Sequence, residues 1–413
     1  MEIREKIRIE EELTTIFTPA TPVRTDDVFA GRLDQIIRVL SAINQRGQHA
    51  IIYGERGVGK TSLANVLIYA KFIHKVAVPV TKVTADSKSS FFSLWNDVFQ
   101  RVEMPHDVAQ RVSEAGADTE NTVGNPRRNR TYADSITENP SPGDVVDVLR
   151  TFPESVIMID EFDRIHDDDV TSSFADLIKQ LSDNDINITL ILIGVADNIS
   201  ELIAEHASIE RCTKQVYLPR MSQDELEEII RKGFKKIHMK YERATPGAIA
   251  RLSQGFPHYT HQLGLYAGLE ALRRDRMEIR VSDVQVAIEN AIADALATTQ
   301  SAYVQSIRST KKENLYERVL IACAIANQDE LGYFAPVDVK KPLCLMVGNE
   351  HRSPNFGPHL AKFCGKERGK ILERIEIGSS HRCRYRFRNP LMRPYVFLRG
   401  VSSGLVPKGY SPF

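Results

Sequence analysis

The sequence has little cysteine and no long apolar run. None of its hydrophobic stretches approaches the roughly 20 residues that a membrane-spanning helix needs, and the opening MEIREKIRIE is too charged for a secretory signal. We therefore expect a cytoplasmic protein without a membrane partner. The widely spaced cysteines form no paired C-x-x-C of the zinc-binding type, so we expect reduced, mostly buried thiols. They are Cys212, Cys323, Cys344, Cys364 and Cys383.

The chain also lacks a net charge, because 54 Lys and Arg balance 54 Asp and Glu. The distribution is nevertheless uneven. From Arg308 to the end, 19 basic residues stand against 9 acidic ones, which leaves 35 against 45 in the rest of the chain. A basic tail after an acidic body suggests a polyanionic partner for the tail. A length of 413 residues exceeds one compact core and predicts about two or three domains.

The most specific motif is GERGVGKTS, which follows the apolar run AIIY and precedes an amphipathic helix beginning SLANVLIYA. A glycine, four residues and Gly-Lys-Thr between a strand and a helix is the pattern of a phosphate-binding loop. Backbone N–H groups and the helix dipole hold phosphate oxygens, Lys60 reaches the outer phosphates, and the Thr61 hydroxyl ligates magnesium. We expect contacts to the nucleotide from Gly54, Glu55, Arg56, Gly57, Val58, Gly59, Lys60, Thr61 and Ser62.

A second nucleotide-site signature is VIMIDEF, in which four apolar residues from Val156 run into two adjacent acids. Asp160, at the end of the expected strand, can hold magnesium through water. Glu161 can orient and deprotonate the attacking water. About 100 residues after a phosphate loop, this pair predicts hydrolysis of ATP with Mg²⁺ as cofactor. A GTPase is disfavoured, because no Asn-Lys-x-Asp segment for reading guanine appears.

Three further buried strands are expected, at 76–84, 189–194 and 215–218. Asp197 and Asn198 follow the second of these and are candidates to touch the outer phosphate or the attacking water. The alternative is that they cap the helix beginning ISELI. Ser222 and Glu225 form a capping box before the next helix.

Two helices and one insertion complete the first half of the chain. The helix after Val28, Phe29 and the Gly-Arg pair is either a packing helix or the element that covers the adenine, and the sequence leaves both open. The aromatic stripe of SSFFSLWNDVFQRV, with the only tryptophan, is expected in the core. Residues 104–143 are polar and irregular, which predicts a flexible insertion.

The motifs FAGR, GERGVGKT, VIMIDEFDRI, ILIGVADN, SIERCTKQVYLPRMS and QGFPHYTHQ, in this order, resemble the origin-recognition-like branch of the AAA+ ATPases. That branch borders on the STAND signalling ATPases and on the ATPases of bacterial transposons. The resemblance covers about residues 25–290. It implies an α/β fold with a five-stranded parallel sheet, ATP at its carboxyl edge, and a small helical lid.

The resemblance also implies roles for two single residues. Arg211 in SIER stands where the family places an arginine finger that reaches a neighbouring subunit, which implies self-association through the ATP site; a plain surface arginine is the alternative. His258 stands where relatives often carry a lid arginine on the outer phosphate. With His261 one turn later, this departure predicts a weaker or pH-sensitive hold of the lid on ATP.

The basic tail is expected to begin with a helix at 311–327, followed by helices around 337–343 and 354–366 and by two strands, ILERIEIG and RCRYRFRNPL. Cys383, Tyr385 and Phe387 alternate with arginines along the second strand. Three helices and a basic hairpin predict a winged helix that contacts duplex DNA, although the arginines also suit a solvated face. The candidate DNA contacts are Lys362, Lys366, Arg368, Arg382, Arg384 and Arg386.

The resulting organisation is an N-terminal arm (1–24), an AAA+ core (25–220), a helical lid (221–307) and a basic winged-helix domain (308–413). The leading interpretation is an ATP-hydrolysing, oligomeric switch that associates with DNA. The alternative is a STAND-like signalling ATPase, for example in phage defence, whose basic tail docks an effector protein.

Overall fold

The computed structural model describes residues 2–22, 30–69, 78–105, 108, 130–197, 199, 202–203, 209–309, 315–348, 354–377 and 382–413. These residues divide into two compact units, which we describe separately. The first comprises residues 1–31, 55–59 and 219–413, and the second residues 32–54 and 60–218. Among the described residues, no helix is long and apolar enough to cross a membrane.

The second unit is built on a parallel five-stranded sheet, as the sequence predicts. Its strands are β1 (His49–Gly54), β2 (Val80–Thr84), β3 (Ser155–Asp160), β4 (Ile188–Val195) and β5 (Thr213–Tyr217), in the order β2-β3-β4-β1-β5. β1, β3 and β4 are almost continuously apolar and buried, which is typical of parallel strands covered on both faces. Each expected strand exists, with bounds shifted by a few residues.

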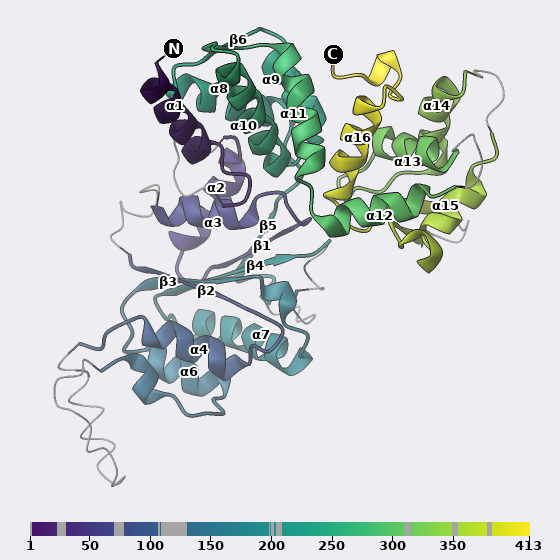
Figure 1. Cartoon of the computed structure of the whole chain (residues 1–413). Helices are drawn as coiled ribbons and strands as arrows, with labels where there is room; N and C mark the ends of the chain where they lie inside the picture. The colour runs from purple at the N-terminus through teal and green to yellow at the C-terminus, as the bar shows by residue number, and fades with distance from the viewer. Residues whose placement is uncertain are drawn as a thin grey trace. The chain divides into compact units, whose positions relative to one another are not determined.

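Helices cover both faces of this sheet (Figure 1). One layer contains α2 (Leu33–Ile43) and α3 (Lys60–Tyr69), and the other contains α4 (Phe91–Gln100), α6 (Pro142–Leu149) and α7 (Asp168–Asp183). The aromatic stripe lies in the core as expected, since Trp95 is fully buried in the cluster that α4 and α7 share with the sheet. α2 packs through Ile36, Val39 and Ala42. Val28 and Phe29, on which the adenine alternative rests, lie outside the described residues.

The flexible insertion predicted at 104–143 extends too far at its carboxyl end, where the structure describes folded residues. Thr131 bridges to Glu103, and the short 3₁₀ helix η1 (Tyr132–Ser135) follows it. Tyr132 is fully buried and donates its hydroxyl to the Thr151 carbonyl at 2.6 Å. Its aromatic ring packs on Phe152 with centroids 4.7 Å apart. One aromatic residue inside a polar stretch is therefore enough to return the chain to the core.

The first unit begins with α1 (Ile3–Ile16), which packs on α10 (Pro257–Arg273) through Ile9, Leu13 and Ile16. The other lid helices are α8 (Gln223–Lys236), α9 (Thr245–Ser253) and α11 (Val281–Ala293). A two-residue parallel pair, β6 (Lys240–Tyr241) and β7 (Glu278–Ile279), joins their loops. Ser222 and Glu225 form the predicted capping box at the start of α8. These helices occupy the stretch predicted to be the lid, and the N-terminal helix α1 packs on them; their role as a lid is still a prediction.

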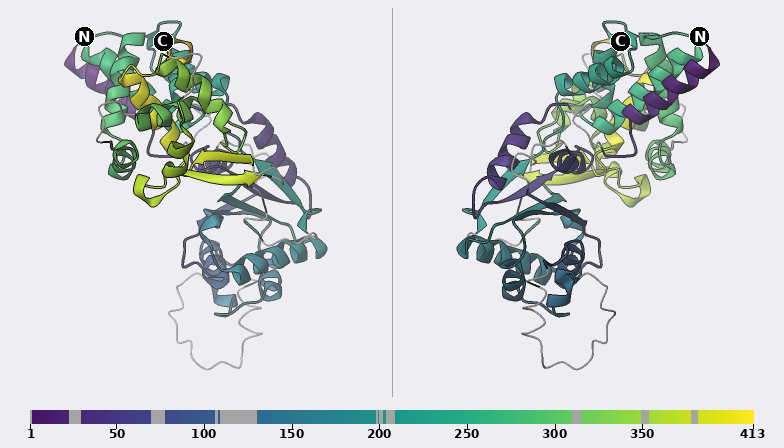
Figure 2. Two further views of the ribbon diagram at one scale, coloured as in Figure 1. Left: turned by 90° about the vertical axis from the view of Figure 1, so that its right-hand side faces the viewer. Right: turned by 90° about the vertical axis from the view of Figure 1, so that its left-hand side faces the viewer.

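The basic tail continues in the same unit. It contains α12 (Ala297–Ile307), α13 (Leu315–Ile325), α14 (Pro336–Met346), α15 (Gly357–Phe363) and α16 (Met392–Ser402). β8 (Leu372–Ile377) and β9 (Arg382–Phe387) form the expected antiparallel hairpin, drawn in yellow-green in Figure 2. Tyr385 also bridges to Phe334, which lies between α13 and α14. All five cysteines are free, and three of them are buried.

Candidate nucleotide-binding site

The phosphate loop leaves the carboxyl end of β1 and enters α3 at Lys60, which is the strand–loop–helix order that the motif requires. Gly57 and Gly59 have φ angles of +88° and +98°, a region that residues with a Cβ rarely occupy. The start of α3 presents backbone N–H groups and the positive end of the helix dipole to the loop. Thr61 and Ser62 lie in its first turn and are half-buried.

Lys60 is held at the base of the loop. Its side chain is buried, with the residue only 8% exposed, and its Nζ donates to the Gly54 carbonyl at 2.9 Å. A buried ammonium is costly without partners. The end of the loop therefore carries a preplaced positive charge, which is the group that the sequence assigns to the outer phosphates.

Asp160 is the last residue of β3, and both of its carboxylate oxygens are engaged. Oδ2 lies 2.8 Å from Lys82 Nζ, and Oδ1 accepts the Glu161 backbone N–H at 2.9 Å. Lys82 reaches it from the neighbouring strand β2 and also donates to Asn65 Oδ1 at 3.1 Å. The Asp160 side chain is 6% exposed. The carboxylate is therefore paired and fixed in direction.

Glu161 sits in a left-handed backbone conformation, with φ +56°. Such a conformation is unfavourable for a residue with a long side chain, and strain of this kind is concentrated at functional sites. The side chain is 47% exposed, and its Oε2 lies 2.9 Å from Arg164 Nη1. This hydrogen bond with Glu161 raises the pKa of Arg164. The backbone thus turns Glu161 away from the strand and toward solvent.

The strand order brings three carboxyl ends together, because β4 lies between β1 and β3. Gly54 is level with Val195 in the β1–β4 pairing, and Ile159 is level with Leu192 in the β3–β4 pairing. Asp163 Oδ1 accepts the Val195 N–H at 2.8 Å and ties the segment after β3 to the end of β4. Within the second unit, Lys60, Asp160 and the residues after β4 therefore share one edge of the sheet.

The residues after β4 carry the candidates for contact with the attacking water. Asp197 follows β4 and is half-buried, and it has at least one polar or electrostatic interaction. Asn198 lies outside the described residues. The choice between a phosphate contact and a helix cap is therefore still a prediction.

Magnesium fits the chemistry of this edge. The available donors are the Thr61 hydroxyl and the Asp160 carboxylate, and Mg²⁺ prefers hard oxygen ligands. In the described part of the chain, no group of three or more His, Cys, Asp or Glu is placed to hold a metal ion. An ion held by two side chains, water and nucleotide phosphates agrees with both observations.

The two lid histidines hold the N-terminal segment. His258 Nδ1 donates to the Pro19 carbonyl at 2.8 Å, and His261 Nδ1 accepts the Thr18 N–H at 3.3 Å. Burial, with a smaller effect of His258, lowers the pKa of His261 to about 4. His261 is therefore a neutral structural residue near pH 7. The role of His258 toward a phosphate is still a prediction.

Arg211 lies near the amino ends of the strands, at the edge of the sheet opposite to Lys60 and Asp160. It precedes β5, whose first residue, Thr213, pairs with the first residue of β1. Its side chain is 68% exposed and its Nη2 lies 2.8 Å from Asp183 Oδ1. Gln48 Nε2 donates to the Arg211 carbonyl at 2.8 Å. Within one chain, Arg211 is not brought to Lys60 and Asp160, so any action on phosphate belongs to a neighbouring copy.

The candidate DNA contacts differ in how free their charges are. Arg368 stacks on Tyr316 at 3.8 Å and donates to the Ser306 and Arg308 carbonyls, which closes the end of α12. Arg384 pairs with Asp329. Arg386 pairs with Glu373 and lies over the Tyr333 ring. Lys362 is exposed on α15, with its Nζ 6.0 Å from the Tyr316 ring, and Lys366 lies in the short helix that follows. Of Arg382, only the backbone is described.

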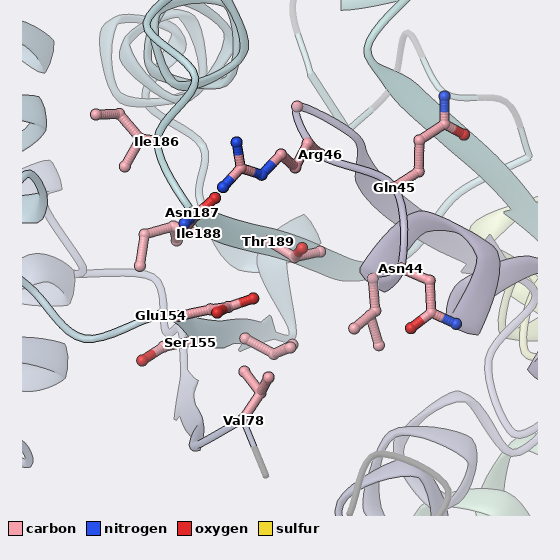
Figure 3. Close-up of a pocket in the computed structure, with 13 residues that line it drawn as sticks. Asn44, Gln45, Arg46, Val78, Glu154, Ser155, Ile186, Asn187, Ile188 and Thr189 are labelled. Atoms are coloured by element: carbon pink, nitrogen blue, oxygen red, sulfur yellow. The ribbon is translucent and has the colours of Figure 1, made fainter. Parts of the chain in front are cut away.

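A pocket of about 250 Å³ opens at the amino edge of the same sheet (Figure 3). Its lining includes Asn44, Arg46, Glu154, Asn187 and Thr189. These residues precede β1, β3 and β4 or begin them, whereas the phosphate loop and Asp160 lie at the carboxyl ends. The pocket is therefore distinct from the nucleotide-binding edge.

Sequence reasoning missed three charged residues at the site. Lys82 and Arg164 pair with Asp160 and Glu161, and Arg220 pairs with Glu55 of the phosphate loop. Lys82 carries a recognisable signal, because it is the one charged residue in the middle of the short strand VTKVT. No local pattern distinguishes Arg220, whose partner is 165 residues away.

Comparison with solved structures finds folds of distant sequence. They include Cdc6p from Pyrobaculum aerophilum (13% identity, 95% of this chain and 98% of that one, TM-score 0.45) and a Walker-type ATPase of Pyrococcus abyssi (13%, 92% and 99%, 0.46). Another is the Orc1 protein of Aeropyrum pernix, solved in complex with DNA (15%, 93% and 95%, 0.44). At these identities and TM-scores the likeness identifies neither activity nor partners.

The family comparison is more extensive. No protein of curated function matches the sequence. The family model described as Novel STAND NTPase 1 matches residues 22–331, which include the phosphate loop, Asp160, Glu161, Arg211 and the lid. This agrees with the STAND side of the resemblance found in the motifs. Because the match spans about three quarters of the chain, the protein belongs to the Novel STAND NTPase 1 family.

Proposed function

We propose that this protein binds ATP with Mg²⁺ and hydrolyses it as a conformational switch. The observation that carries the proposal is the placement of Asp160 and Glu161 at the end of β3, on the sheet edge from which the phosphate loop emerges. A fixed carboxylate and a solvent-facing carboxylate one residue later suit two different tasks. The first suits a metal-bound water and the second a reacting water.

Each residue has a defined part in this proposal. Residues from Gly54 to Ser62 hold the phosphates through backbone N–H groups, with Lys60 on the outer ones. Thr61 and Asp160 hold Mg²⁺, which neutralises charge that develops on the phosphates. Glu161 accepts a proton from the attacking water. Asp197, Asn198 and His258 are the remaining candidates for contact with the outer phosphate.

We further propose that hydrolysis requires self-association. Arg211 is exposed near the amino edge of its own sheet, so it can stabilise transferring phosphate only in a second copy. An arginine supplied from a neighbour contributes a fixed, always-charged donor to the transition state. Its pairing with Asp183 is a solvent-exposed ion pair, which is weak enough to exchange for a phosphate partner.

The tail is proposed to be a winged helix that contacts duplex DNA. The support is the surplus of ten basic residues after residue 307 together with the order of elements: α13, the bridge at Phe334, α14, α15, β8 and β9. In such a domain the third helix enters the major groove and the hairpin follows the backbone. The proposed contacts are Lys362, Lys366, Arg368, Arg382, Arg384 and Arg386.

The second candidate is a STAND-like signalling ATPase whose tail docks a protein partner. The family match favours it, and so does the pairing of Arg384 and Arg386 with carboxylates of the chain itself. An arginine that already has an acidic partner neutralises DNA phosphates less, so fewer counterions are released from the DNA on binding. The salt dependence of DNA binding separates the two candidates.

ATP binding and hydrolysis are tested with two variants. Lys60→Ala should lose both binding and turnover, whereas Glu161→Gln should retain ATP and lose turnover by at least about 100-fold. Binding is measured with a fluorescent ATP analogue and turnover by phosphate release. Equal ATP affinity in the wild type and Lys60→Ala would refute the assignment of the loop.

A further inference from the structure

The tip of the phosphate loop packs with the tail of the chain. Residues Glu55–Gly59 belong to the unit that contains the lid and the basic tail, whereas Gly54 and Lys60 on either side belong to the unit that contains the sheet. A Cβ added to Gly57 would lie 2.8 Å from Leu391 Cδ2 and 3.5 Å from Phe256 Cδ1. The Leu391 carbonyl in turn accepts the Tyr259 hydroxyl at 2.9 Å. Tail and lid residues therefore surround the loop.

The most specific contact is a buried ion pair between Glu55 and Arg220. Arg220 donates through Nε and Nη2 to the two Glu55 carboxylate oxygens, at 2.6 and 2.8 Å, in a bidentate arrangement. The side chains are 14% exposed for Arg220 and 8% exposed for Glu55. Arg220 also lies over the Phe256 ring at 4.9 Å. The geometry suits arginine alone, because lysine cannot make two parallel hydrogen bonds.

The tail supplies the third partner of Arg220. Its Nη1 donates to Gln328 Oε1, in the loop that follows α13. The Gln328 Nε2 is buried without a hydrogen-bond partner among the described residues. Burying the amide nitrogen costs desolvation free energy, while the amide oxygen accepts a hydrogen bond from Arg220.

Backbone of the same loop approaches the pair closely. A Cβ added to Gly332 would lie 2.5 Å from Arg220 Nη2 and 3.0 Å from Glu55 Oε1. Gly332 also has φ +80°. Glycine therefore permits a tail turn to sit directly against the bidentate pair.

A second guanidinium interacts electrostatically with the same carboxylate. Arg393, in α16, donates through Nε to the Ala324 carbonyl at 3.0 Å. Desolvation, with repulsion from Arg220, lowers the pKa of Arg393 to about 9, and attraction from Glu55 opposes this shift. Glu55 is thus balanced by two arginines, both outside the loop. Without them it would place a negative charge beside the site assigned to the phosphates.

We infer that Arg220 is a positioning residue for the nucleotide site: it neutralises and fixes Glu55, and through Gln328 and Gly332 it links the phosphate loop to the basic tail. The inference rests on the proposed ATP binding and adds a route by which the tail reports on it. Docking of the 328–332 turn orders Arg220, which removes repulsion between Glu55 and the phosphates. By reciprocity, bound ATP strengthens the docking of the turn.

The test compares ATP affinity in Arg220→Ala and in the double variant Glu55→Gln/Arg220→Ala. Arg220→Ala removes the bidentate partner of Glu55, so that more of its negative charge is felt at the loop, and should weaken ATP binding by about tenfold. The double variant removes that charge and should recover most of the loss. A purely structural role of Arg220 predicts no recovery. Equal affinity in the wild type and Arg220→Ala would overturn the inference.

A glycine pair provides a matched control that leaves the charges intact. Gly332→Ala places a Cβ against Arg220, whereas Gly404→Ala shares the left-handed backbone, with φ +68°, and meets no atom within 4 Å. Both variants carry similar backbone strain. Only Gly332→Ala should weaken ATP binding, by about fivefold or more. Equal effects of the two substitutions would contradict the inference.

Hydrogen exchange of backbone amides in the tail measures whether ATP binding is coupled to the tail. The Gly332 N–H donates to the Asp329 carbonyl, and the Phe334 N–H donates to the Tyr385 carbonyl. ATP should slow exchange at these amides by at least about fivefold in the wild type and leave it unchanged in Arg220→Ala at saturating ATP. Lys60→Ala separates the outcomes. If it binds ATP like the wild type, the proposed function fails; if it loses ATP while Arg220→Ala retains wild-type affinity and protection, only this inference fails.

Discussion

Lys82 Nζ lies 2.8 Å from Asp160 Oδ2, so the carboxylate assigned to magnesium is paired with a lysine of the neighbouring strand. A magnesium ion at the proposed site would compete with Lys82 for this buried negative charge. The pair also stabilises the fold, because removing one partner of a buried pair leaves the other uncompensated. We therefore expect Lys82 to affect both the stability of this sheet edge and its proposed affinity for Mg²⁺.

Lys82→Met should lower stability in the absence of magnesium by about 3 kcal/mol. It should also reduce the Mg²⁺ concentration for half-maximal ATP hydrolysis by about tenfold, because Asp160 no longer shares its charge. Thermal unfolding with and without Mg²⁺ and a magnesium titration of turnover measure the two effects. Lys240→Met, an exposed lysine of the lid, is the control. An unchanged magnesium requirement would argue against Asp160 as a metal-side residue.

The left-handed backbone at Glu161 should lower the stability of the fold, and replacing this residue tests that cost. Its φ of +56° is easily adopted by glycine, so Glu161→Gly should stabilise the fold relative to Glu161→Gln by about 1 kcal/mol. That difference corresponds to roughly 2–4 °C in Tm for a unit of this size. Both variants should lack hydrolysis. A glycine variant less stable than the glutamine variant would show that the backbone at this position carries no strain.

Arg211→Ala should abolish hydrolysis, by about 10³-fold, while ATP affinity stays within twofold of the wild type. Stability should change little, since the exposed pair with Asp183 contributes less than about 1 kcal/mol. Mixing Arg211→Ala with Glu161→Gln should restore part of the turnover, because one kind of interface then holds an intact Arg211 and an intact Glu161. If turnover per wild-type chain does not depend on protein concentration, the proposal that Arg211 acts in the site of a neighbouring copy is wrong.

DNA binding should respond to the in-chain partner of Arg384. Asp329→Asn removes that partner and should raise DNA affinity and steepen the plot of log affinity against log salt by about one unit. Lys362→Ala/Lys366→Ala should flatten the same plot by about two units. Affinity for one duplex is measured at several salt concentrations. Identical slopes in all three proteins would favour the protein-docking alternative.

Stability should fall in mild acid because of two buried histidines. Burial lowers the pKa of His49 and of His261 to about 4, against 6.5 for an exposed histidine. Between these values the unfolded chain binds protons that the folded chain does not, so stability is complete above about pH 6.5 and declines as pH approaches 4. Each residue accounts for about 3 kcal/mol at pH 4.

The measurement is Tm from pH 4.5 to 7.5 for the wild type and His261→Gln. Glutamine retains an acceptor for the Thr18 N–H without a titrating ring. The variant should therefore show a shallower decline in acid. An equally steep decline would mean that His261 is protonated in the folded protein.

The nucleotide-binding core could be predicted from local sequence patterns alone. Apolar strands followed by Gly54–Ser62 and by Asp160–Glu161 are local patterns, and parallel strands bring their carboxyl ends together whatever the details of packing. The aromatic core around Trp95, the Ser222 capping box and the tail hairpin are equally local. Periodicity over a few residues is sufficient for each of these predictions.

Which charged residues pair with one another depends on the folded chain and could not be predicted from local patterns. Lys82 pairs with Asp160 from the neighbouring strand, Arg220 pairs with Glu55 over 165 residues, and Arg384 pairs with Asp329. The tertiary structure also returned Tyr132 to the core from a stretch that looks disordered in composition. Such contacts depend on chain segments far apart in sequence, and no short pattern specifies a partner at that distance. The motifs thus identify where chemistry occurs, while the packing of the chain sets which of its charges are balanced there.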